Sequence, residues 1–113
     1  MADLRETNRL ITMAGEDAVS VLREIEIILI SLHKIGSYYA TVEFDGGDAG
    51  GYAAETCRFV DDWRVTERLA TARAILSNAF DATLGEDDMD DLERAMESLP
   101  HWAGPGSDAP PRS

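Results

Sequence analysis

The 113-residue sequence is poor in the residues that build recognisable chemical sites. It has a single cysteine, Cys57, which excludes an intramolecular disulfide and a thiol metal cluster. Its two histidines, His33 and His101, stand in neither of the H-x-x-x-H and H-E-x-x-H spacings of zinc sites. We therefore expect no metal and no cofactor, and we expect Cys57 to be a buried structural thiol.

The sequence also lacks a long apolar run. The most apolar stretch, residues 25–32, is interrupted by Glu26 and is too short to span a bilayer. Charged residues follow Met1 where a secretory signal would need an apolar segment. We expect a cytoplasmic protein with no membrane partner.

Enzyme signatures are equally scarce. The chain contains no G-x-S-x-G, no G-x-x-x-x-G-K-[ST] and no G-x-G-x-x-G. The glycines of residues 46–51 are accompanied by Asp45 and Asp48, which would repel a phosphate, so this segment is interpreted as a turn. We expect a protein that is not an enzyme.

Negative charge, in contrast, is abundant. There are 22 Asp and Glu residues against 10 Lys and Arg, which gives a formal net charge of -12. Such a field repels nucleic-acid backbones, so direct nucleic-acid binding is not expected. It favours a basic protein partner, such as a nuclease or a CRISPR effector. The alternative is that the charge only keeps the protein soluble.

The N-terminal third has a heptad pattern that predicts one long helix over residues 3–35, ended by Gly36. Apolar or small residues alternate at spacings of three and four, and Leu22 and Leu29 widen the apolar stripe on one side, as a globular core demands. The positions of this pattern are Leu4, Thr7, Ile11, Ala14, Ala18, Val21, Ile25, Ile28, Leu32 and Ile35.

The next segment alternates in polarity, and this pattern predicts a β-hairpin. Residues 37–45 are rich in aromatic and β-branched side chains and are interpreted as a strand, and residues 52–60 as its returning partner. A helix from Ala53 onward is the alternative. The strand is preferred because the helical stripe of the following segment does not extend back in phase through Cys57 and Val60.

Two more helices are predicted, over residues 62–84 and 86–99, the first with an apolar stripe that includes Leu69 and Leu76. The predicted fold class is α+β, mostly helical, in the order α-β-β-α-α. We expect a single acidic domain over residues 1–102 and a disordered tail over residues 103–113, which is rich in glycine and proline.

Two contact surfaces follow from these assignments. The Ala14–Ala18 region of the first helix predicts an oligomer interface of Ile11, Ala14, Ala18, Val21 and Ile25. A polar hairpin edge and the acidic third helix predict a surface for a basic partner, on which exposed tyrosine could bind Arg or Lys by cation–π contact. The residues of the second surface are Tyr39, Glu43, Asp45, Asp48, Glu86, Asp87, Asp88, Asp90 and Asp91.

These features favour a small acidic interaction protein that inhibits or sequesters a basic, nucleic-acid-handling protein by charge-complementary steric blocking. Anti-CRISPR, anti-restriction, antitoxin and immunity proteins, several of them carried by phages, work in this way. The alternative is a homodimeric structural or assembly subunit that docks through its long N-terminal helix. No motif identifies a family.

Overall fold

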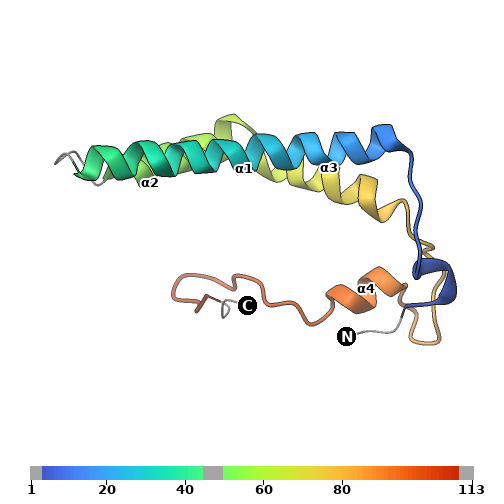
Figure 1. Ribbon diagram of the computed structural model, residues 1–113. Coiled ribbons are helices and arrows are strands. Elements are labelled where there is room, and N and C mark those ends of the chain that lie inside the picture. Colours follow the sequence, from blue (N-terminus) through green and yellow to red (C-terminus); the bar gives the residue numbers. More distant parts are fainter. Residues whose placement is uncertain (1–3, 45–49, 110–113) are drawn as a thin grey trace. The chain divides into compact units, whose positions relative to one another are not determined.

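The computed structural model describes residues 4–44 and 50–109. Contacts divide the chain into two compact units. One, the hairpin unit, is Thr12–Ala79, and the other, the terminal unit, is formed by Met1–Ile11 together with Phe80–Ser113. Figure 1 shows the helices of both units.

The hairpin unit is built from three helices. The long helix α1 (Gly15–Phe44) packs along α3 (Val65–Ser77) over its N-terminal part and along α2 (Gly50–Asp62) over its C-terminal part (Figure 1). Glu16 and Asp17 lie in the first turn of α1, where carboxylates are favoured by the helix dipole. Thus α1 forms one side of an antiparallel helical hairpin, and α2 and α3 form the other.

The break between α2 and α3 lies at Trp63 and Arg64. Arg64 adopts the left-handed conformation, with φ of 51° and ψ of 51°, which a residue with a Cβ rarely adopts within a helix. The amide of Arg68 bonds to the carbonyl of Arg64 and starts the new helix. Because the chain turns here, the residues of α2 that face α1 and those of α3 that face α1 need not follow one continuous helical spacing.

The described residues of the terminal unit contain little regular structure. A 3-10 turn, η1 (Glu6–Asn8), lies near the N-terminus, and a short helix, α4 (Asp91–Met96), lies beyond the hairpin unit in sequence. Asp90 caps α4: its carboxylate accepts a bond from the Glu93 amide, and the Glu93 side chain accepts one from the Asp90 amide. This reciprocal pair is a capping box.

The predicted α+β fold class is wrong, because the regular elements of the described residues are all helices and include no strand. Residues 37–44 continue α1 instead of forming a strand, and α2 replaces the returning strand over residues 52–60. Tyr39 and Val42 extend the inward-facing row of Ile28 and Ile35 at helical spacing. Residues 52–60 form a helix although the apolar stripe of α3 does not extend back through them, because the break at Arg64 allows α2 and α3 to have separate stripes.

The predicted helix boundaries also shift. The first helix starts at Gly15 instead of residue 3 and passes through Gly36, whose environment is open. The helix predicted over 62–84 ends at Ser77, and the one predicted over 86–99 covers only Asp91–Met96. The single domain over 1–102 and the disordered tail over 103–113 stay predictions.

The buried apolar core is thin. Among the described residues, the buried apolar side chains are Val21, Phe59 and Ala72, which remain 4–5% exposed, and none is fully enclosed. Two antiparallel helices bury only the strip along which they touch, which here includes Val21 of α1 and Ala72 of α3. A 113-residue chain would normally bury roughly two thirds of its unfolded surface. Much of the apolar surface of the hairpin therefore remains open.

The helix break at Arg64 leads to a test with two substitutions of the same kind. Arg64→Gly should raise the free energy of unfolding by about 1 kcal/mol, because glycine adopts positive φ without steric cost. Arg73→Gly, in the interior of α3, should lower it by about 1 kcal/mol. Urea denaturation of both variants measures the effects, and a destabilising Arg64→Gly would contradict the left-handed break.

Candidate interaction surfaces

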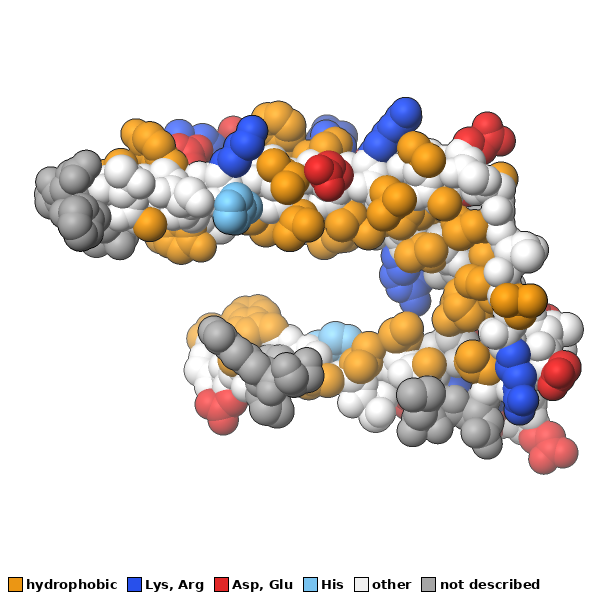
Figure 2. All heavy atoms as spheres, in the orientation of Figure 1, with side chains coloured by type: hydrophobic (Ala, Val, Ile, Leu, Met, Phe, Trp, Pro, Cys, Tyr) orange, Lys and Arg blue, Asp and Glu red, His pale blue; other side chains and the backbone are white. Residues whose placement is uncertain are grey.

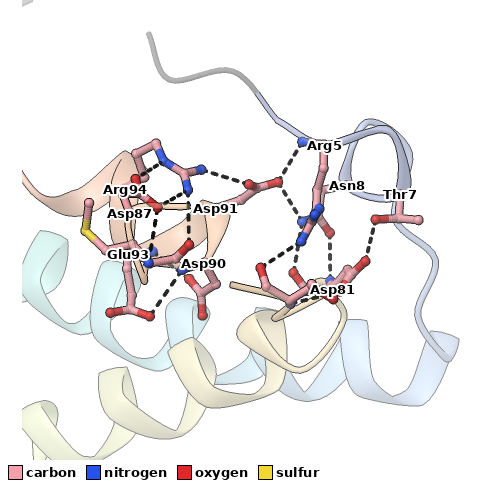
Figure 3. Close-up of polar contacts among 11 residues, drawn as sticks. Arg5, Thr7, Asn8, Asp81, Asp87, Asp90, Asp91, Glu93 and Arg94 are labelled. Atoms are coloured by element: carbon pink, nitrogen blue, oxygen red, sulfur yellow. Dashed lines mark hydrogen bonds and ion pairs between the residues drawn. The ribbon is translucent and has the colours of Figure 1, made fainter. Parts of the chain in front are cut away.

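Asp91 is the centre of a polar network in the terminal unit (Figure 3). Its Oδ2 accepts hydrogen bonds from the Arg5 amide at 2.7 Å and from Asn8 Nδ2 at 2.9 Å. Its Oδ1 accepts one from Arg94 Nη1 at 3.0 Å. The bond to Asn8 and that to the Arg5 amide are the main causes that hold the pKa of Asp91 below its usual value. The buried carboxylate therefore joins the N-terminal segment to α4.

Asn8 joins the same N-terminal segment to the chain around Asp81. We call its bonds to Asp91 and Asp81 the Asn8 junction. This side chain is only 3% exposed, and it exchanges two hydrogen bonds with the backbone of Asp81: Nδ2 donates to the carbonyl at 3.0 Å, and Oδ1 accepts from the amide at 2.7 Å. The Asp81 carboxylate accepts bonds from Thr7 and Thr83, which lower its pKa to about 2. The residues that were predicted to begin a long helix are thus held by the segment around Asp81.

Arg94 binds a second carboxylate. Its Nε and Nη2 donate to the two oxygens of Asp87, both at 2.8 Å, in a bidentate arrangement. Nη2 also donates to the Met89 carbonyl at 3.0 Å. The bidentate bond holds the pKa of Asp87 well below its usual range and raises that of Arg94. Arg94 thus holds the 87–89 turn against α4.

The surface predicted to bind a basic partner is therefore largely committed to internal contacts. Asp87, Asp90 and Asp91 are used in the Arg94 pair, the capping box and the Asn8 junction. Glu86 and Asp88 are exposed, and their carboxylates form no hydrogen bond or ion pair with other described residues, although the Asp88 amide donates to the Gly85 carbonyl at 3.1 Å. The side chain of Glu43 and the whole of Asp45 and Asp48 lie outside the described part of the chain.

Tyr39 is on a helix, not on the polar edge of a strand. Its hydroxyl donates to Glu55 Oε1 at 3.2 Å, and its ring lies 4.8 Å from that of Tyr38 and 6.4 Å from that of Tyr52. Desolvation first, and then the bond to Glu55, raise the pKa of Tyr39. A Cβ at Gly51 would lie 2.6 Å from Cε1 of this ring, so glycine lets α2 approach it. Tyr39 therefore contributes to the packing of α1 on α2.

The residues of the predicted oligomer interface lie in different environments. Ile11 belongs to the terminal unit and is half-buried, whereas Ala14 is exposed and Ala18 is half-buried in the hairpin unit. Val21 is buried within the hairpin unit, and Ile25 is 41% exposed. Of this set, Ile25 is thus the large apolar side chain that α1 presents to solvent.

Ile25 belongs to an exposed row that combines positions of the predicted heptad pattern with Leu22 and Leu29, which were predicted to widen its apolar stripe. Leu22, Ile25, Leu29 and Leu32 are spaced three and four residues apart along α1 and are 62%, 41%, 58% and 40% exposed. This spacing keeps all four on one side of the helix, next to the inward-facing Val21. The row is therefore an apolar surface on α1 that the hairpin leaves uncovered.

Helix α3 adds Leu69 and Leu76, 48% and 40% exposed, to the same side of the hairpin. Each follows an inward-facing residue by one position, as Ile25 does on α1. Two antiparallel helices are related by a two-fold axis perpendicular to the plane that contains them, and this rotation does not exchange the two faces of the pair. A residue one position after an inward-facing residue therefore points to the same face of the hairpin from either helix. Figure 2 shows hydrophobic side chains gathered along the hairpin. We call this set the apolar flank: Leu22, Ile25, Leu29, Leu32, Leu69 and Leu76.

The other candidate sites offer less. Cys57 is exposed, so its prediction as a buried thiol is wrong. No cluster of three or more His, Cys, Asp or Glu side chains within the described ranges is arranged to hold a metal ion. None of the described helices combines the length and apolarity that crossing a lipid bilayer requires.

Comparison with known proteins adds no relative. No family model matches the chain, and neither a curated protein nor a solved structure is significantly similar to it.

The Asn8 junction leads to a stability test. Asn8→Ala removes both bonds to the Asp81 backbone and one donor to Asp91, and it should cost about 1–3 kcal/mol because buried partners lose their bonds. Asn78→Ala, at an exposed position after α3, is the matched control and should change stability little. Thermal unfolding of the two variants measures the difference, and equal stabilities would show that the junction contributes nothing.

Proposed function

We propose that this chain is an interaction module without catalytic activity, which docks the apolar flank of its helical hairpin on a helical surface of another polypeptide. The observation that carries the proposal is the exposure of six large apolar side chains on one side of a hairpin with a thin core. Contiguous apolar patches on soluble proteins usually mark sites of association.

The spacing of the flank supports a helical partner. Leu22, Ile25 and Leu29 follow the i, i+3, i+7 pattern by which an amphipathic helix packs its apolar side into a groove or against other helices. Leu69 and Leu76 on α3 form a second ridge at heptad spacing. A further helix that packs between these ridges would give the hairpin the second layer that it lacks.

The flank can be tested by co-purification. Tagged full-length protein, co-expressed in the source cell with an untagged copy, should retain a stoichiometric protein, either the untagged copy or another chain. Leu29→Glu should weaken that retention at least about tenfold, because the variant loses apolar burial and buries a carboxylate. Ser37→Glu introduces the same charge at an exposed position of α1 outside the flank and should not. Retention that is equal in both variants would refute docking through the flank.

A second candidate function retains the acidic character of the chain. In this proposal the module inhibits a basic nucleic-acid-handling protein, such as a nuclease or a CRISPR effector, by presenting carboxylates where a phosphate backbone would bind. It is supported by the exposed carboxylates of Glu86 and Asp88, which have no bonding partner among the described residues, and by the exposed Glu93 and Glu97 of the same segment.

Salt dependence tests this second function. The double variant Glu86→Gln, Asp88→Asn should bind a basic nuclease more weakly than the wild type, with a smaller loss of affinity as ionic strength rises. The control Asp61→Asn, Glu67→Gln changes the net charge equally, at exposed positions of α2 and α3. If inhibition of the nuclease is the same for both double variants, the 86–97 segment is not the inhibitory surface.

A further inference from the structure

We infer that the partner on the apolar flank is a second copy of this chain, packed so that the two α1 helices run antiparallel. The inference rests on the proposed docking function and adds the identity of the partner. Two observations carry it: the scarcity of carboxylates on the flank of a chain with a net charge of -12, and the symmetry of the α1 row.

The flank is the least acidic side of α1. Of the five carboxylates described on α1 and α3, four lie off it: Glu16, Asp17, Glu24 and Glu67. Glu24 faces α3, where its Oε2 pairs with Arg68 at 3.2 Å. Only Glu26 lies beside the apolar row of α1, at the position that His33 repeats seven residues later. A basic partner would favour a rim of several carboxylates, whereas this rim suits a partner that is as neutral as the flank itself.

The row is also symmetric along the helix. From Ala18 through Leu22, Ile25, Leu29 and Leu32 to Gly36 the spacings are four, three, four, three and four, which read the same in both directions. An antiparallel copy would therefore place Leu22 opposite Leu32, and Ile25 opposite Leu29. The small residues at the two ends, Ala18 and Gly36, would also lie opposite one another.

This symmetry is what a two-fold interface requires, because the same patch must complement itself. The centre of the row lies between Ile25 and Leu29, next to Glu26. The Glu26 carboxylates of the two copies would then approach each other across the axis. Because two like charges that approach each other weaken association, Glu26 is expected to oppose the dimer and not to support it.

Sedimentation equilibrium of the full chain tests the inference. The wild type should have twice the monomer mass of 12.4 kDa in the micromolar range. Leu29→Glu should raise the dissociation constant at least about tenfold, whereas Ser37→Glu should leave it unchanged. Glu26→Gln should lower the dissociation constant on the order of threefold, and misfolding could not produce such a tightening.

The outcomes distinguish self-association from docking of the flank on another protein. A wild type that is monomeric throughout the micromolar range, or a dimer insensitive to both Leu29→Glu and Glu26→Gln, would overturn self-association. If such a monomer still retains another protein in the co-purification assay, and loses it on Leu29→Glu, the docking function stands with a different partner. If the monomer retains nothing, both proposals fall.

Discussion

A single pair of antiparallel helices can bury only the strip along which the helices touch, and this constraint leaves much of the apolar surface of the hairpin unit exposed. Val21 on α1 and Ala72 on α3 lie in the strip and are buried, whereas Leu22, one position after Val21, and Leu69, one position after the inward-facing Arg68, are about half exposed or more. A residue step of about 100° is enough to move a side chain from the strip to the surface. The apolar flank is thus a consequence of having one layer of helices where a domain usually has two.

The terminal unit is held together in a different way. Its junction is polar: the buried Asp91 carboxylate and the buried Asn8 amide satisfy each other and several backbone groups. A buried carboxylate that accepts three bonds is stabilised in its charged form, which agrees with its lowered pKa. Asp87 and Asp90 are likewise bound internally, by Arg94 and in the capping box, whereas Glu86 and Asp88 stay exposed. Much of the acidity of residues 87–91 therefore has a structural role.

Sequence reasoning found the helical character of the chain and the apolar side of α1, because a heptad pattern depends only on local spacing. It did not distinguish a strand from a helix over residues 37–60. There the alternation of Tyr38, Ala40 and Val42 indicates a strand, whereas Tyr39 and Val42 continue the row of Ile28 and Ile35 at helical spacing. It predicted the acidic surface from composition, but it could not tell that Asp87 and Asp91 would be bound by Arg94.

Three properties can be read from the amino-acid sequence alone: the charge, the scarcity of catalytic and metal-binding motifs, and the spacing that places Leu22, Ile25, Leu29 and Leu32 in one row. Which of two adjacent apolar rows is buried depends on where α2 and α3 pack. Residues 4–14 leave the helical path because Asn8 gains buried bonds to Asp81 and Asp91 that a helix could not offer. Both outcomes depend on contacts between residues far apart in the sequence, such as the 44 positions between Glu24 and Arg68 and the 83 between Asn8 and Asp91, which a local pattern does not contain.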